Sequence, residues 1–330
     1  MTRGQRLRVD TTVVETNIHD PTDSTLLADG VRVLTRTMKQ LAARARAAGD
    51  HIRDRTRSVN RRVFEIIQRS RAAGRGTAST EAKRQARVTA LYKEVMAITT
   101  SVVHRAERIL DDQPRRRDRQ AGRLHDRLAA MTRLVRRVRA QARARVVQGD
   151  THYPDKVLSL FEPQTDVIRK GKAAKPTEFG KVVKIQEAEG QIITDYEVCA
   201  TRVPDKALWL SALERHQALF GRVPRMAVAD AGFASATNER AARQLGIRQV
   251  VLPRRGALTV GAPTAERPRW YRRALRWRTG CEGRISAVKR SPGLRRCLYR
   301  GAAGMERWVG LGVIASNLLV LGRARPSAIS

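Results

Sequence analysis

The chain has 330 residues, with 66 Lys and Arg against 31 Asp and Glu, so its formal net charge is +35. Hydrophobic residues make up 42 %, which is enough for a packed core and argues against a wholly disordered polyelectrolyte. The charge predicts a polyanionic partner, and nucleic acid is favoured over an anionic membrane surface. The three cysteines have no CxxC spacing, which favours a reducing, cytoplasmic location and argues against a disulfide framework or a structural zinc site.

The N-terminal residues predict a single β-strand. Residues 6–15 (RLRVDTTVVE) alternate between two faces and are rich in β-branched side chains. Because an isolated strand is not stable in water, we expect it to pair with strands beyond residue 150.

The next segment predicts a block of about four helices. Residues 23–150 carry 31 Lys and Arg against 13 Asp and Glu, a net charge of +18, and their apolar residues recur at helical spacing. Breaks are expected near residues 49–50, 74–76 and 111–114, where Gly, Asp and Pro gather. Solvated helices with arginines on their outer faces are one interpretation, and contact with phosphates is the favoured one.

The residues after 150 return to short strands alternating with helices. A strand–helix–strand order predicts that the strands at 225–229 and 248–252 are parallel. The apolar run 308–322 is too short to span a bilayer comfortably and is expected to be a buried core helix, so no membrane partner is expected. The remaining predicted elements are strands at 156–161, 178–187 and 191–199, a helix at 205–220 capped by Asp205, and helices at 234–245 and 270–290.

These elements predict an α/β fold, in which a mixed sheet carries helices on its faces. The first strand (residues 1–22) belongs to the same core as residues 151–330. Residues 23–150 form a large basic all-α insertion between the first and second strands.

Three acidic residues stand out in so basic a chain. Asp10 lies in the middle of a strand, where Asp is disfavoured. Asp230 follows the apolar run MAVA, at the carboxyl end of a predicted parallel strand, where open α/β sheets bind ligands. Glu282 shares one face of its predicted helix with Arg278 and Lys289.

Each of these acids also has a purely structural interpretation. Asp10 suits a charge on an edge strand, Asp230 a turn or cap residue, and Glu282 a surface pair with Arg278. Taken together, however, two carboxylates on adjacent strands and a third on a helix predict a site for two Mg²⁺ or Mn²⁺ ions acting on a phosphodiester.

Four sequence blocks resemble the DDE transposases of bacterial insertion sequences. The first catalytic block corresponds to VDTTVVETNI (residues 9–18), followed by PTDS (21–24). The family's second block, which precedes its second catalytic block, corresponds to LSLFEP (158–163) with IRKGK (168–172). The second catalytic block corresponds to ADAGFAS (229–235), and the third to RTGCEGRIS (278–286). The blocks occur in the family's order and extend over essentially the whole chain.

The resemblance implies a ribonuclease H-like catalytic core in which Asp10, Asp230 and Glu282 are the metal ligands. The family's helical signature also has a Tyr at the position of Leu275, and an Arg is common at the position of Ala231. A further domain usually precedes the family's first strand, and we expect this chain to lack it.

The function implied is metal-dependent cleavage at transposon DNA ends and strand transfer into target DNA. The partners implied are double-stranded DNA and a second copy of the chain, as a homodimer on DNA. Two alternatives stay open: an inactive remnant that only binds DNA, and a ribonuclease H-like nuclease that cuts without joining. The residues expected to bind DNA are Arg278, Arg284, Lys289, Lys170 and Lys172.

Overall fold

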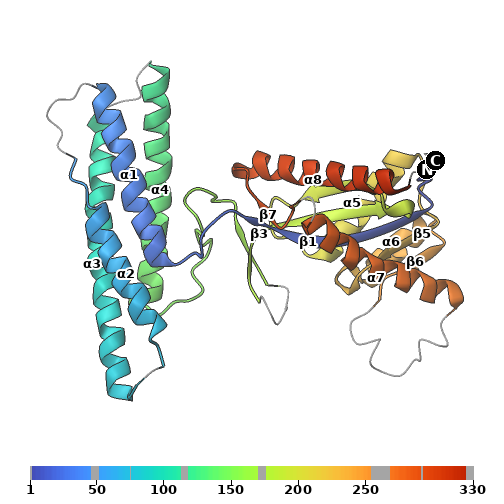
Figure 1. Cartoon of the computed structure of the whole chain (residues 1–330), viewed down its shortest axis with the longest axis horizontal. Helices are drawn as coiled ribbons and strands as arrows, with labels where there is room; N and C mark the ends of the chain where they lie inside the picture. Colours follow the sequence, from blue (N-terminus) through green and yellow to red (C-terminus); the bar gives the residue numbers. More distant parts are fainter. Residues whose placement is uncertain are drawn as a thin grey trace, which may run out of the picture. The chain divides into compact units, whose positions relative to one another are not determined.

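The computed structural model describes residues 2–45, 52–74, 76–112, 118–169, 176–253, 268–290 and 293–324. They form two compact units, which Figure 1 shows. Unit 1 comprises Met1–Asn17 and Gln164–Ser330, and unit 2 comprises Ile18–Pro163. Unit 1 therefore contains both ends of the described chain.

Unit 2 contains the four predicted helices, which lie side by side in Figure 1. They pack through stripes of Leu, Val, Ile and Met side chains that form one hydrophobic core. Gly30 lets α1 approach α4, because a Cβ at Gly30 would lie only 2.9 Å from the Val135 side chain. The helices are α1 (Asp23–Ala45), α2 (Thr56–Arg71), α3 (Ala78–Asp112) and α4 (Arg119–Val147).

Unit 1 is built on a mixed sheet with the strand order β2-β3-β1-β5-β6, in which β4 pairs with β3 and β7 with β1. β1 is antiparallel to β3 and parallel to β5, and β5 is parallel to β6. The strand that opens the chain therefore pairs with strands beyond residue 150, as predicted. The strands are β1 (Arg6–Thr16), β2 (Asp166–Ile168), β3 (Glu178–Ala188), β4 (Ile193–Val198), β5 (Met226–Ala229), β6 (Gln249–Val251) and β7 (Arg296–Cys297).

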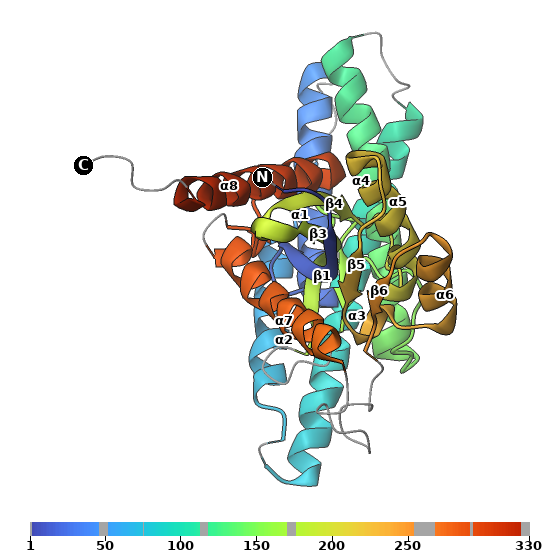
Figure 2. The same cartoon turned by 90° about the vertical axis from the view of Figure 1, so that its right-hand side faces the viewer.

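Helices cover both faces of this sheet, which confirms the predicted α/β class. Helices α5 (Trp209–Phe220) and α6 (Ala236–Gln244) pack on one face, and α7 (Arg269–Arg290) and α8 (Gly301–Ala324) pack on the other. Figure 2 shows the strands between these two pairs of helices. Three short 3-10 turns complete the unit: η1 (Glu189–Gln191), η2 (Asp205–Leu208) and η3 (Ala231–Phe233).

The strand predicted at residues 156–161 is wrong. The Val157 amide donates to Oε1 of Gln141 at 2.9 Å, and Nε2 of Gln141 donates back to the Val157 carbonyl at 3.1 Å. Because a side chain of α4 takes both backbone groups, they are not available for pairing within a sheet. Val157 and Leu160 instead contribute to the core of unit 2.

The expectation of a buried core helix at residues 308–322 is only half right. Val309 and Val313 of α8 pack against the sheet, but Leu311, Ile314 and Leu318 are 54–63 % exposed. The run is apolar on both sides, so hydropathy alone does not distinguish its packed face from its exposed one. α8 is also long and apolar enough to cross a membrane, a test that core helices of soluble proteins pass as well.

Candidate functional site

The candidate site begins with the alternation of side chains along β1. Leu7 and Val9 point into the core shared with α5 and α6. The intervening Arg8 and the following Asp10 therefore belong to the face covered by α7. β1 lies between β3 and β5 in the sheet, so the interpretation of Asp10 as an edge-strand charge is wrong.

The sheet places Asp10 next to Asp230. In the parallel register of β1 and β5, Val9 pairs with Ala229. Asp10 directly follows Val9, and Asp230 directly follows Ala229. Neighbouring strands are about 4.8 Å apart, which brings the two backbones side by side at the carboxyl end of β5. Both residues are half-buried. The carboxylate of Asp10 accepts a hydrogen bond from the Thr11 amide at 2.7 Å.

Asp230 also has the structural role that its sequence position suggested. It is the N-cap of η3, and its Oδ1 accepts a hydrogen bond from the Gly232 amide at 2.8 Å. A carboxylate has about four lone-pair sites, so capping leaves the group able to accept further contacts.

Helix α7 brings the third acidic position to the same region. The thiol of Cys281 is buried and lies close enough to Asp10 for that carboxylate to act on it. Burial, followed by the nearby charge of Asp10, raises the pKa of this thiol well above its ordinary value. Glu282 is the next residue of α7, and its side chain lies outside the described part of the structure.

The buried side chain of Arg8 joins β1 both to β3, through an ion pair, and to α7, and the sequence patterns did not reveal these contacts. Nη2 of Arg8 donates to Oε1 of Glu187 on β3 at 2.5 Å, and the side chains are only 5 % and 1 % exposed. Nη1 of Arg8 donates to the main-chain carbonyl of Trp277 on α7 at 2.6 Å, and the guanidinium lies 5.2 Å from the Trp277 ring centroid. Burial raises the pKa of the Glu187 carboxyl, and Arg8 opposes that shift. Strand alternation predicts that Arg8 lies on the same face of β1 as Asp10. That Glu187 is its partner depends on the register between β1 and β3, which the sequence patterns do not give.

Asp205 is a further acid of this region that the sequence analysis placed in another role. It was expected to cap a helix, but Pro204 precedes η2 as its N-cap without a side-chain bond. Instead, Thr11 Oγ1 donates to Oδ1 of Asp205 at 3.0 Å. Oδ2 of Asp205 and Oδ1 of Asp230 lie 2.7 and 3.0 Å from the point that a Cβ at Gly232 would occupy. A larger residue at 232 would therefore force these carboxylates to shift.

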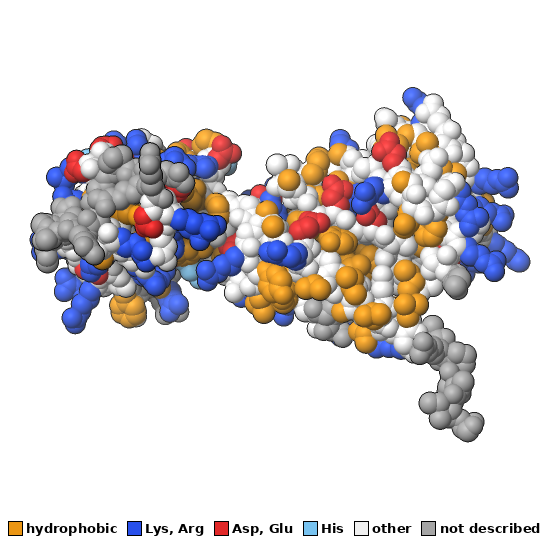
Figure 3. All heavy atoms as spheres, turned by 90° about the horizontal axis from the view of Figure 1, so that it is seen from above, with side chains coloured by type: hydrophobic (Ala, Val, Ile, Leu, Met, Phe, Trp, Pro, Cys, Tyr) orange, Lys and Arg blue, Asp and Glu red, His pale blue; other side chains and the backbone are white. Residues whose placement is uncertain are grey.

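The structure describes three of the five residues that were expected to bind DNA. Arg278, Arg284 and Lys289 are half-buried on α7. Nη2 of Arg284 donates to the Ser316 carbonyl of α8 at 3.3 Å, and burial lowers the pKa of its guanidinium. Lys170 and Lys172 lie outside the described residues. Figure 3 shows Lys and Arg side chains on the surfaces of both units.

The ligand chemistry of this region suits a hard cation. Asp10 and Asp230 supply carboxylate oxygens, which Mg²⁺ and Mn²⁺ prefer. Among the described side chains, which do not include that of Glu282, no group of three or more His, Cys, Asp or Glu is placed to hold a metal ion. A metal ion bound at these two aspartates would therefore need a further ligand from outside the described side chains.

Comparison with known proteins gives one match. Residues 234–321 match the family model of the transposase DDE domain, which confirms the resemblance indicated by the motifs. The matched region contains Glu282 and begins after Asp230. No curated protein and no solved structure compared with the chain is significantly similar.

Proposed function

This chain carries a transposase DDE domain, and from that premise we propose that it cleaves transposon DNA ends and transfers them into target DNA. The family implies a DNA substrate, nucleotidyl transfer and a general use of divalent metal ions. The observation that carries the proposal is the adjacency of Asp10 and Asp230 on parallel strands, with α7 packed over them at Cys281. A ribonuclease H-like core is the corresponding proposal for the fold of unit 1.

Asp10, Asp230 and Glu282 are the residues that would hold two Mg²⁺ or Mn²⁺ ions. Such ions, when bound, stabilise the charge that develops on the attacking and leaving oxygens of a phosphodiester. Asp10 is fixed on a central strand and Asp230 by its cap, so these carboxylates need little rearrangement to accept a ligand.

The proposed reaction has two steps. Water attacks a phosphodiester at the transposon end, which releases a 3′-hydroxyl on one side of the cut and leaves a 5′-phosphate on the other side, in the same strand. The 3′-hydroxyl then attacks a target phosphodiester, so that a new phosphodiester forms and a target 3′-hydroxyl leaves. Arg278 and Lys289 would contact phosphates beside the reacting bond, as would Arg284 and the residues Lys170 and Lys172.

The test uses the full chain with duplexes that carry the element's ends. We expect nicking that requires Mg²⁺ or Mn²⁺, joining of pre-cleaved ends to a target, and loss of both in Asp10→Asn, Asp230→Asn and Glu282→Gln. Calorimetric titration with Mn²⁺ gives a second readout, because each variant should bind the metal more weakly even without DNA. Asp195→Asn is a suitable control. Asp195 forms an ion pair with Arg215 and lies on β4, which pairs with the edge of β3 that faces away from β1.

The two alternative functions predict different results. A nuclease without strand transfer would give hydrolysis products and no joined product from pre-cleaved ends. A remnant that only binds DNA would show no metal-dependent cleavage in either the wild-type chain or Asp230→Asn. Equal cleavage by both of these proteins would contradict the assignment of Asp230.

A homodimer on DNA and a cytoplasmic location complete the proposal. All three cysteines are buried thiols, which suits a reducing compartment. Light scattering of the chain with and without end-containing DNA would measure the number of copies, and one copy per DNA end pair would contradict the dimer.

A further inference from the structure

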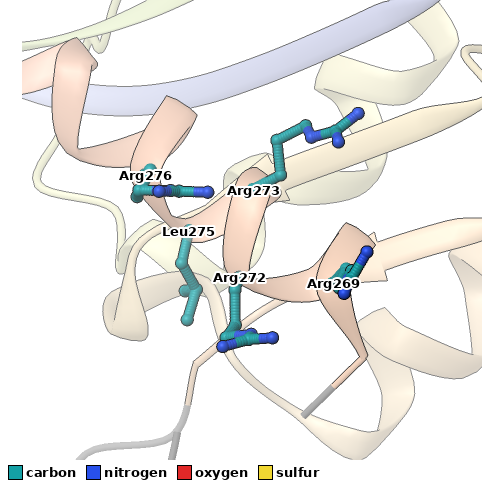
Figure 4. Close-up of a pocket in the computed structure, with 5 residues that line it drawn as sticks. All are labelled: Arg269, Arg272, Arg273, Leu275 and Arg276. Atoms are coloured by element: carbon teal, nitrogen blue, oxygen red, sulfur yellow. The ribbon is translucent and has the colours of Figure 1, made fainter. Parts of the chain in front are cut away.

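The first turns of α7 present four arginines around a cavity. Arg269, Arg272, Arg273 and Arg276, together with Leu275, line a cavity of about 470 Å³, shown in Figure 4. Arg269, Arg273 and Arg276 are exposed, and Arg272 is half-buried. None of these residues was among those expected to bind DNA.

The described part of the chain supplies no anionic partner for these arginines. Among the described residues, no ion pair or side-chain hydrogen bond involves any of the four. Like charges three or four residues apart destabilise a helix, and the first turn of a helix favours acidic side chains. α7 has no acid in its first turn. Four guanidinium groups without an acidic partner among the described residues favour the binding of an anion, and Arg matches phosphate oxygens in geometry.

The arginines lie on a different face of α7 from the candidate catalytic position. Ala274, Tyr271 and Trp277 pack against the sheet, so the arginines between them lie on the outer side. Nine residues separate Arg273 from Glu282, which is about two and a half helical turns and places position 282 on the opposite side of the axis. A phosphate bound at Arg273 would therefore lie on another side of α7 from one bound at position 282.

We propose that Arg269, Arg272, Arg273 and Arg276, the arginine face of α7, bind the phosphate backbone of a second DNA segment, distinct from the segment at the candidate carboxylates. The choice of DNA as the polyanion rests on the proposed function. In the two-step reaction, the end and the target are two such segments. The arginine face would hold the target duplex while the carboxylates act on the end.

The first experiment measures binding alone, in EDTA, with a fluorescent duplex of arbitrary sequence. The fourfold variant Arg269→Gln, Arg272→Gln, Arg273→Gln, Arg276→Gln is compared with a control that removes the same charge elsewhere in unit 1. The control is Arg295→Gln, Arg300→Gln, Arg307→Gln, Arg323→Gln, all exposed residues. The loss of four phosphate contacts should lower the salt dependence, the slope of log K against log salt, by about 3–4.

The expected result is a lower slope and at least tenfold weaker binding for the arginine-face variant only. Equal changes in both fourfold variants would overturn the proposal, because net charge alone would explain them. Unchanged DNA binding in the arginine-face variant would also overturn it. If the variant binds DNA normally but no longer binds tripolyphosphate, the arginines form a site for small anions, and the proposal is overturned as well.

The second experiment tests whether the segment is distinct. With Mg²⁺ and a short end duplex, the arginine-face variant should hydrolyse the end at the wild-type rate and lose strand transfer to a separate target at least tenfold. Equal losses in both steps would overturn the second-segment assignment. Absence of activity in the wild-type chain would count against the proposed function, and the binding experiment would still decide the arginine face.

Discussion

Arg8 on β1 and Glu187 on β3 lie directly opposite each other in the antiparallel register and form a buried ion pair of 2.5 Å. Arg8 also donates to the main-chain carbonyl of Trp277, so one side chain joins two strands to α7. This contact lies two residues before Asp10 on the same face of β1. It therefore sets how α7 lies against the candidate site.

Removing Arg8 should destabilise unit 1 strongly. Arg8→Met leaves the Glu187 carboxylate buried without its partner, which costs about 3–5 kcal/mol of the free energy of unfolding. The double variant Arg8→Met, Glu187→Leu should recover most of that loss, because neither charge then remains buried. Urea unfolding followed by tryptophan fluorescence measures this specifically, since all four tryptophans (209, 270, 277 and 308) belong to unit 1. A double variant as unstable as the single one would contradict this account.

Enlarging Gly232 should impair the site more than the fold. In Gly232→Ala the new methyl group would press on the carboxylates of Asp205 and Asp230, which lie 2.7 and 3.0 Å from its position. We expect activity to fall by tenfold or more, about 1.4 kcal/mol in transition-state stabilisation, and Mn²⁺ binding to weaken in parallel. Gly322→Ala is the matched control, because nothing lies within 4 Å of a Cβ there. Similar activity in the two variants would argue against Asp230 as a ligand.

His216 should make unit 1 less stable in mild acid. Its buried Nε2 lies 3.0 Å from the Gly4 carbonyl and so donates to it, while Nδ1 is buried without a hydrogen-bond partner among the described residues. Burial lowers the pKa of this histidine from its ordinary value of 6.5. Between that folded-state pKa and 6.5, the unfolded chain binds a proton that the folded chain does not.

The free energy of unfolding should therefore decrease as the pH falls below 6.5, by at most about 1.4 kcal/mol per pH unit from this group. Above that pH the histidine is neutral in both states and has no effect. Urea midpoints at pH 7.5 and 5.5 check the trend, again by tryptophan fluorescence. His216→Gln should show a smaller difference between the two midpoints, and an unchanged difference would assign the effect to other groups.

The sequence by itself determined the type and order of most elements. The period-two pattern of residues 6–15 and the helical spacing in residues 23–150 are local, and β1 and the four helices of unit 2 follow them. The strand–helix–strand order likewise fixed the parallel pairing of β5 and β6, because a chain of that length between two strands crosses over a face of the sheet.

Only the tertiary structure decided which side chains meet. The partners of Arg8 and of Thr11 are far away in sequence, at Glu187 and Asp205, so their contacts depend on strand register and on the packing of η2. The same holds for residues 156–161, whose strand-like pattern is overridden by the Gln141 side chain. Hydrophobic periodicity indicates which residues of a segment share a face, but not which residues of other segments pack against that face. The high positive charge thus predicted a polyanion from composition alone, while the outward arginine face of α7 became evident only from its packing on the sheet.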